Sequence, residues 1–254
     1  MEVLIVNYNT PELTAAAIQS LWKHTPEAKV TVFDNSGKRP LSSIQNSKFK
    51  IQNCGQDEYE LCTMDYELSV IDNTRGQYVD WDKWLSQFPD KRPCPENNWG
   101  SAKHTYSIDF CMDRFPDGFV LMDSDVLVKQ DITPLCDPSQ AFVGEVAYCL
   151  RRHGFTAQRV LPFLCWINTP MLRQHGIRYF NPEKTWKLTN VFPYCWYDTG
   201  ASFFEEVENA HLPYSTVSVD DYVLHYCNGS WNQHSDPMAW LKENKELWTM
   251  DYEL

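Results

Sequence analysis

Short apolar runs alternate with polar turns at the start of the chain. Val3–Val6 and Val30–Phe33 are apolar or β-branched runs of strand length, typical of strands buried on both faces of a parallel sheet. Between them, Thr10-Pro11-Glu12 has the order of a helix start: an N-cap residue, a proline in the first turn and an acid near the helix N-terminus. The pattern predicts a β-α-β unit with parallel strands.

The middle of the chain breaks this regularity. Residues 55–97 are acidic, contain prolines and aromatics, and have no clear period, so we interpret them as an insertion with one short helix near Trp81–Phe88. A third strand is expected at Lys48–Gln52. Further along, the pattern predicts helices at 101–112, 170–175 and 199–209, and strands at 119–123, 141–149, 160–167 and 222–226.

Composition and charge limit the classes of function. With 254 residues, of which 43% are hydrophobic, the chain can bury the core of one α/β domain. Its formal net charge of −12 argues against binding nucleic acid, which depends on neutralising phosphates with Lys and Arg. An acidic protein that binds an anionic nucleotide needs a metal ion to offset the repulsion.

Cysteine usage and hydropathy suggest where the protein works. The nine cysteines form an odd set without a C-x-x-C pair, which disfavours a zinc framework and a secreted disulfide scaffold. The sequence shows no signal-peptide pattern, and no apolar stretch approaches the ~20 residues that span a bilayer. We therefore expect a reduced, cytoplasmic protein without a transmembrane segment, and peripheral contact with a membrane stays compatible with this sequence.

An acidic pair follows the most apolar run. Phe119-Val-Leu-Met122 ends at Asp123-Ser-Asp125, which places two carboxylates just after a predicted buried strand. Oxygen ligands favour Mg²⁺ or Mn²⁺, and these ions usually share their coordination between one or two carboxylates and the phosphates of a ligand. The segment predicts a divalent cation site at an edge of the sheet, and the alternative is an ordinary capped turn.

One internal repeat has no function that the sequence favours. Residues 60–68 read ELCTMDYEL and residues 246–254 read ELWTMDYEL. The two nine-residue segments differ at a single position, where the first has Cys62 and the second has Trp248. A local duplication and a tail that mimics the first copy are both compatible with the match.

Six segments in chain order carry a resemblance to a known family. They are Val3-Leu-Ile-Val-Asn-Tyr-Asn9, Val32-Phe-Asp-Asn-Ser36, Asn98-Trp-Gly100, Phe119–Asp125, Tyr197-Asp-Thr-Gly200 and His225-Tyr-Cys-Asn-Gly-Ser-Trp231. Together they resemble glycosyltransferase family 2. The resemblance implies a single GT-A domain, a Rossmann-like, mostly parallel α/β sheet flanked by helices. Residues 1–125, with the insertion at about 55–97, would bind the nucleotide-sugar, and residues 126–254 would bind the acceptor.

The resemblance also implies a metal site and a donor site. Asp125 would bind Mn²⁺ or Mg²⁺, Asp123 would reach the ribose or the metal through water, and His225 would complete the site, although a lone His is often only hydrogen-bonded. Asp34 would accept a hydrogen bond from the uracil N–H, although an Asp-Asn-Ser-Gly turn favours Asp in any case. Tyr8 would pack on the base.

The remaining roles concern the pyrophosphate and the acceptor. Lys103 would contact the pyrophosphate. Asp198 would take the proton of the acceptor hydroxyl as general base; its alternative reading is a helix N-cap. Asp220 and Asp221 are the reserve candidates for the base. Three tryptophans are candidates for lining the acceptor groove: Trp99, Trp196 and Trp231.

These observations predict an inverting, metal-dependent glycosyltransferase. It would move a sugar from a nucleotide-sugar, a UDP-sugar by the likeness, to a hydroxyl of a glycan or of a lipid-linked sugar. The chain has no G-x-x-x-x-G-K-[ST] or G-x-G-x-x-G motif, which disfavours P-loop kinases and dinucleotide oxidoreductases. A nucleotidyltransferase, and a catalytically silent nucleotide- or carbohydrate-binding protein, are the alternatives.

Overall fold

The computed structural model describes most of the chain. It describes residues 1–43, 50–53, 58–62, 67–88, 97–147, 150–151, 154–184, 188–189, 195–226 and 236–249. These residues belong to two compact units, each made of separate segments. Unit 1 comprises Met1–Asp80, Leu121–Pro134 and Ser218–Leu254, and unit 2 comprises Trp81–Val120 and Leu135–Val217. The single domain with a boundary after Asp125 stays a prediction.

Unit 1 is built on a sheet whose central strands are parallel. The strand order is β6-β1-β2-β5-β4-β3. β1 pairs in parallel with β2, which pairs in parallel with β5, whereas the β5–β4 and β4–β3 pairs are antiparallel. The bounds are β1 (Glu2–Asn7), β2 (Lys29–Asp34), β3 (Lys50–Asn53), β4 (Glu58–Cys62), β5 (Leu68–Asp72) and β6 (Phe119–Asp123), whose first two residues belong to unit 2.

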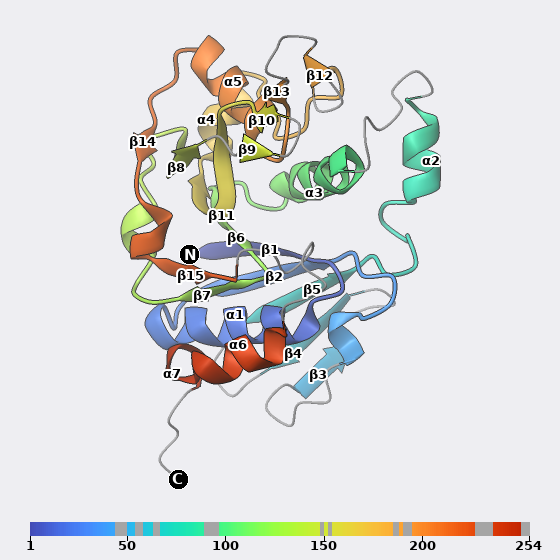
Figure 1. Ribbon diagram of the computed structural model, residues 1–254, viewed down its shortest axis with the longest axis vertical. Helices are drawn as coiled ribbons and strands as arrows, with labels where there is room; N and C mark the ends of the chain where they lie inside the picture. Colours follow the sequence, from blue (N-terminus) through green and yellow to red (C-terminus); the bar gives the residue numbers. More distant parts are fainter. Residues whose placement is uncertain are drawn as a thin grey trace. The chain divides into compact units, whose positions relative to one another are not determined.

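Helix α1 (Pro11–His24) covers the sheet of unit 1 and packs on β1 (Figure 1). Helices α6 (Pro237–Glu243) and α7 (Lys245–Trp248) pack on α1. A small ribbon of β7 (Val126–Val128) and β15 (Val223–His225) also contacts this helix through β7. Two short 3-10 helices complete the unit, η1 (Leu41–Ser43) and η3 (Val219–Asp221), and a third, η2 (Thr133–Leu135), spans the boundary with unit 2.

Apolar burial explains why these elements hold together. Leu4, Ile5 and Val32 are completely buried, as is Leu21 of α1. Fully burying a side chain of this kind stabilises a protein by about 1.5–3 kcal/mol. Helix α1 begins as expected with Pro11 directly after Thr10, and every residue from Leu13 to Trp22 is buried.

Unit 2 is built around the long strand β11 (Arg159–Ile167). β11 pairs antiparallel with β8 (Phe142–Ala147), and β14 (Ser215–Thr216) pairs in parallel with β8. A second sheet has the order β12-β13-β10-β9, with bounds Leu188–Thr189, Cys195–Trp196, Gly154–Thr156 and Leu150–Arg151. The helices are α2 (Trp81–Ser86), α3 (Asn97–Met112), α4 (Thr169–Gln174) and α5 (Ala201–Asn209), and α5 packs on β11.

Most predicted elements are present, but the expectation of a single short helix as the only element in residues 55–97 is wrong, whereas the insertion itself stays a prediction. The short helix is α2, yet β4 and β5 also lie in this stretch. β5 is a central strand, because it pairs in parallel with β2 from Val30↔Leu68 to Asp34↔Asp72. The predicted strand at Lys48–Gln52 corresponds to β3, which lies at the end of the order rather than next to β2.

The two copies of the repeat adopt different secondary structure where they are described. Glu60 and Leu61 lie in β4, whereas Glu246 and Leu247 lie in α7. Identical letters thus follow their tertiary surroundings rather than an intrinsic preference. Residues 63–66 and 250–254 lie outside the described residues. Within the described part of the chain, no helix is both long and apolar enough to cross a lipid bilayer.

Candidate functional site

Two short strands of unit 1 bring His225 to the acidic turn. β6 ends at Asp123, the chain turns at residues 124–125, and β7 then pairs antiparallel with β15 in the register Val126↔His225. The backbone N–H of Tyr226 donates to the carbonyl of Asp125 at 2.9 Å, which locks this register. The pairing of these strands thereby brings Asp125 and His225, which are 100 residues apart in the sequence, into contact.

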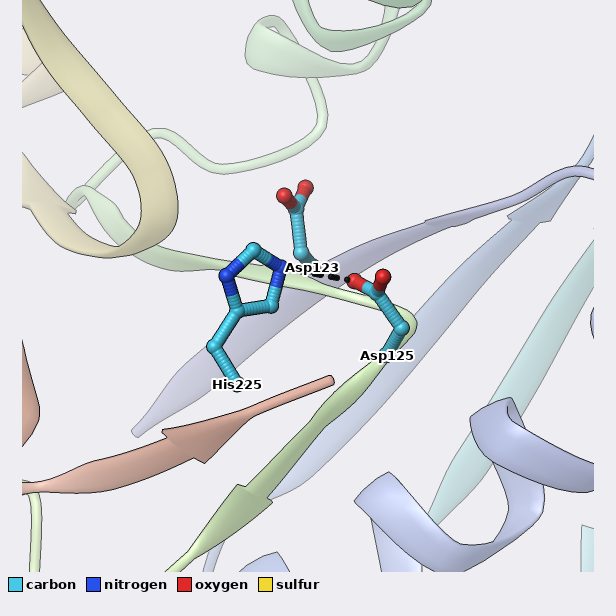
Figure 2. Close-up of side chains that lie close together, drawn as sticks. All are labelled: Asp123, Asp125 and His225. Atoms are coloured by element: carbon cyan, nitrogen blue, oxygen red, sulfur yellow. Dashed lines mark hydrogen bonds and ion pairs between the residues drawn. The ribbon is translucent and has the colours of Figure 1, made fainter. Parts of the chain in front are cut away.

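Figure 2 shows the resulting cluster of Asp123, Asp125 and His225. One ligand atom from each residue lies within 4.8 Å of the others. The Nε2 atom of His225 lies 3.2 Å from Oδ1 of Asp125, and both side chains are largely buried, at 12% and 13% exposure. Two carboxylates and an imidazole are suitable ligands for Mn²⁺, and the carboxylates also for Mg²⁺. The three residues that the sequence assigned to a metal site are together.

The electrostatics of this cluster are dominated by negative charge. Burial alone lowers the pKa of the His225 imidazole, because it disfavours the charged form. The hydrogen bond to Asp125, together with the charges of Asp125, Asp123 and Asp220, outweighs burial and leaves the pKa of His225 above its ordinary value. A cluster that attracts a proton in this way also attracts a metal cation.

The acidic turn is tied to the loop that follows β1. The hydroxyl groups of Ser124 and Thr10 lie 3.1 Å apart, within hydrogen-bond distance. The side-chain Oδ1 of Asn7 in turn accepts from the Thr10 hydroxyl at 3.1 Å and from the Thr14 hydroxyl at 2.9 Å. The acidic turn and the first loop of the sheet therefore share one polar network.

Asp34 belongs to the same network and is completely buried. Its Oδ1 accepts from the Asn7 amide at 2.9 Å, and its Oδ2 accepts from the Leu41 backbone N–H at 2.6 Å. Burial raises the pKa of this carboxyl, against the opposing effect of hydrogen bonds from Ser36, Leu41 and Asn7. The loop 34–41 therefore wraps around the Asp34 carboxylate, because the backbone N–H groups of Ser36 and Leu41 both donate to it. The contact of Asp34 with uracil stays a prediction, and it would require that loop to open.

Tyr8 lies in the loop that follows β1 and faces solvent, with 54% of its surface exposed. The next residue, Asn9, has a left-handed backbone with φ of 60°, and its Oδ1 accepts from the backbone N–H groups of Lys38 and Arg39 at 2.9 Å each. Arg39 also pairs with Glu12. The loop is therefore pinned on both sides while the aromatic ring of Tyr8 remains available for stacking.

Asp198 lies in unit 2 and is held by residues from two elements. Its Oδ1 accepts from the Ser101 hydroxyl of α3 at 2.5 Å, and its Oδ2 pairs with Nη1 of Arg159 of β11 at 3.1 Å. The backbone N–H of Thr199 donates to Oδ1 at 2.8 Å. The N-cap of α5 is Gly200, so the reading of Asp198 as a helix N-cap is wrong.

Lys103 also lies in unit 2, two residues after Ser101 on α3. Its Nζ lies 5.2 Å from the ring centroid of Trp81, within reach of a cation–π interaction. Burial lowers the pKa of its ammonium group, and the charge of Asp82 opposes this effect. A pyrophosphate contact by Lys103 stays a prediction.

The reserve residues and the predicted aromatic lining have different outcomes. Asp220 and Asp221 lie in η3 of unit 1, where Asp220 contributes to the negative field at His225 and its carbonyl accepts from Lys129. Trp231 lies outside the described residues, as do the side chains of Trp99 and Trp196. The acceptor groove that these tryptophans would line stays a prediction.

The residues that hold the candidate side chains in place were not predicted from the sequence. Arg159 and Ser101 orient Asp198, and Asn7 and Thr10 connect the first loop to the acidic turn. Asn7 could have been noticed, because a polar residue that ends a fully apolar strand must find partners when it is buried. Arg159 and Ser101 lie far from Asp198 in sequence and gave no such signal.

Comparison with known proteins places the fold. No protein-family model matches the chain, and no curated protein matches it. The apo-form glycosyltransferase GlyE from Streptococcus pneumoniae TIGR4 aligns with a TM-score of 0.51 at 16% identity, over 98% of this chain and 60% of that one. The galactosyltransferase LgtC, crystallised with donor and acceptor sugar analogs, aligns with a TM-score of 0.49 at 13% identity, over 100% and 98% of the two chains. The likeness to GlyE confirms the predicted α/β fold class and shows that this chain shares its fold with a glycosyltransferase; membership of family 2 stays a prediction.

Proposed function

We propose that the chain is a metal-dependent glycosyltransferase that moves a sugar from a UDP-sugar to a hydroxyl of a glycan or of a lipid-linked sugar. The observation that carries the proposal is the convergence of Asp123, Asp125 and His225, whose ligand atoms lie within 4.8 Å of one another. The fold shared with GlyE supports the same class of reaction.

Asp125 and His225 would hold Mn²⁺ or Mg²⁺, and Asp123 would bind the metal or the ribose. A bound ion of this kind acts as a Lewis acid that stabilises the negative charge of a diphosphate leaving group. Two or three protein ligands would leave room for phosphate oxygens on the same ion, as is usual for metal ions shared with a nucleotide. Two carboxylates beside a single imidazole leave excess negative charge at the cluster, which supports occupation by a cation.

Tyr8 would stack on the nucleotide base. An exposed aromatic ring on a loop that its neighbours hold in place loses little conformational freedom on binding. Stacking of a base on an aromatic side chain contributes about 1–3 kcal/mol. We retain Lys103 as a candidate contact of the pyrophosphate and Asp34 as a candidate contact of the uracil, each needing a rearrangement of its present partners.

Asp198 would accept the proton of the acceptor hydroxyl. The acceptor oxygen forms a bond to the anomeric carbon, the bond from that carbon to the phosphate oxygen breaks with its electron pair, and the proton passes to the carboxylate. The proton of the attacking hydroxyl becomes strongly acidic as its oxygen forms the new bond, so a carboxylate can remove it. A single displacement of this kind inverts the anomeric centre.

A second candidate function is supported by one observation. Arg159 and Ser101 already engage the two oxygens of Asp198, an arrangement that a protein without catalysis would also tolerate. A silent binder would hold UDP and Mn²⁺ without turnover. A nucleotidyltransferase would instead transfer the nucleoside monophosphate of a nucleoside triphosphate to a sugar phosphate and release pyrophosphate.

The test is release of UDP from a panel of UDP-sugars with Mn²⁺, with and without a glycan acceptor panel. We expect slow UDP release by hydrolysis with one donor, faster release with a suitable acceptor, and loss of both on addition of a chelator. Tight Mn²⁺-dependent UDP binding without release from any donor would support the silent binder. Formation of a nucleotide-sugar from a triphosphate and a sugar phosphate would support the nucleotidyltransferase.

A further inference from the structure

Arg159 is a cation buried inside unit 2. Its side chain is 5% exposed, at the first position of β11. A buried guanidinium is costly unless it is paired and hydrogen-bonded. Its Nη1 pairs with Oδ2 of Asp198 at 3.1 Å and donates to the carbonyl oxygen of Thr199 at 3.2 Å. One nitrogen thus holds both the carboxylate and the backbone that carries it.

Two further donors fix the other oxygen of the same carboxylate. The Ser101 hydroxyl donates to Oδ1 at 2.5 Å, and the Thr199 backbone N–H donates to it at 2.8 Å. The Asp198 side chain is 15% exposed. Donors from α3, from β11 and from the turn itself therefore restrain a carboxylate that is still partly accessible to solvent.

The backbone at Gly200 shows how closely this turn lies against β11. Gly200 has φ of +86°, and a Cβ at this position would lie 2.1 Å from the carbonyl oxygen of Val160. A residue with a side chain would push the turn away from the strand. The glycine therefore allows Asp198 to approach Arg159 closely enough for the ion pair.

We infer that Arg159 is a positioning residue for Asp198 in glycosyl transfer, and that the Ser101 hydroxyl helps to hold the same carboxylate. This inference rests on the proposed function. The guanidinium fixes the orientation of the carboxylate and stabilises its ionised form, which is the form that accepts a proton from the acceptor hydroxyl. Misplacement of a reacting group by about 1 Å can reduce a rate by about 10²-fold. Arg159 touches neither the acceptor nor the anomeric carbon in this role.

The ion pair could instead serve only to hold the fold together. The two roles differ in what a guanidinium supplied from solution can restore. Arg159→Ala leaves a cavity next to Asp198 that free guanidinium ion can enter, and guanidinium at low millimolar concentration is far below denaturing levels. A structural role predicts reduced stability without a specific recovery of turnover.

The experiment compares Arg159→Ala, Arg159→Lys and wild type, with the UDP-sugar that the wild type uses best. We expect Arg159→Ala to lower kcat about 10–100-fold while Mn²⁺-dependent UDP affinity, measured by calorimetry, stays within about twofold of wild type. Arg159→Lys should retain several times more activity than Arg159→Ala, because an ammonium restores the charge but not the fork of donors. Guanidinium should raise kcat of Arg159→Ala severalfold and leave wild type unchanged. Unchanged kcat in Arg159→Ala, or a loss that neither guanidinium nor lysine recovers, would overturn the inference.

Arg178→Met is the matched control. Arg178 lies in the same unit and pairs with Asp109 at 3.1 Å and with Asp113 at 3.0 Å, so its loss also breaks ion pairs there. We expect it to keep wild-type kcat and to show no response to guanidinium. If Arg159→Ala does not fold, Ser101→Ala replaces it: removal of one hydroxyl should lower kcat about 3–10-fold with unchanged UDP affinity. Absence of UDP release by the wild type would instead refute the proposed function itself.

Discussion

The two candidate carboxylate sites differ in how their charge is compensated. In unit 1, Asp123 and Asp125 lie together, and the basic group beside them is His225, whose imidazole is charged only when it is protonated. In unit 2, Asp198 lies against the permanently charged guanidinium of Arg159. The first site carries excess negative charge and the second is neutralised by the protein itself. A cation is therefore expected to bind at the first site and not at the second.

Asp34 shows a third way to stabilise a carboxylate. It is completely buried, and its hydrogen-bond donors are the neutral groups of Asn7, Ser36 and Leu41. These donors only partly offset burial, since the pKa of the carboxyl remains raised. The position of an Asp after a strand therefore does not reveal its role. Its partners decide whether it is a metal ligand, a proton acceptor or a structural cap.

The largest expected effect is at the site with excess charge. Asp125→Ala removes one negative charge and one ligand, so Mn²⁺-dependent UDP binding should be lost and UDP release should fall about 10⁴-fold, the scale of several kcal/mol of Lewis-acid stabilisation. Titration with Mn²⁺ followed by electron paramagnetic resonance measures the first effect and a coupled UDP assay the second. Retention of wild-type Mn²⁺ affinity by this variant would show that the ion binds elsewhere.

Asp198→Asn tests the other side of the comparison. The variant keeps the shape of the side chain but cannot accept a proton, so kcat for transfer should fall about 10²–10⁴-fold, as for the loss of a general base. Mn²⁺-dependent UDP binding should be unchanged, because the metal ligands are intact. A parallel loss of Mn²⁺ affinity would contradict the separation of roles between the two carboxylate sites.

The close approach of the Asp198 turn to β11 gives a prediction about stability. Gly200→Ala should lower the free energy of unfolding by about 3 kcal/mol, because it adds a clash with the Val160 carbonyl to the cost of a left-handed backbone. Urea denaturation measures the change. Gly176→Ala is the control in the same unit: Gly176 has φ of +67° and no atom within 4 Å of its would-be Cβ, so it should lose only about 1 kcal/mol. Equal losses in the two variants would mean that the turn can move away from the strand.

The two sites also differ in how far the sequence predicted them. Asp123 and Asp125 follow an apolar run directly, so a local pattern was enough, and family likeness supplied His225. Family likeness also indicated Asp198. Its partner Arg159 was not predicted, because an ion pair between residues 39 positions apart leaves no periodic trace.

The fold was predicted where an apolar run or a helix-start pattern is clear, and it was missed where polar residues interrupt a strand or the strand is very short. The parallel β1–β2 pair was predicted from two apolar runs and α1 from the helix-start pattern at Thr10-Pro11-Glu12, and all three elements are present. β5 was missed, because its five residues include Ser69 and Asp72 and lie within an acidic stretch. β7 has only three residues after the acidic turn, and only its pairing with β15 identifies it as a strand.

The smallest predicted effect concerns the link between the first loop and the metal-ligand turn. The hydroxyls of Thr10 and Ser124 lie 3.1 Å apart, and one hydrogen bond contributes about 0.5–1.5 kcal/mol. Ser124→Ala should weaken Mn²⁺ affinity about fivefold. Thr10→Val also removes the hydrogen bond to Asn7 and should weaken it at least as much, and the double variant should lose no more than Thr10→Val alone, because that variant already removes the bond to Ser124. Ser43→Ala, which removes an exposed hydroxyl of unit 1, is the control and should leave the affinity unchanged. Additive losses in the double variant would mean that the two hydroxyls act independently, and that the metal turn does not depend on the loop bearing Tyr8 for its position.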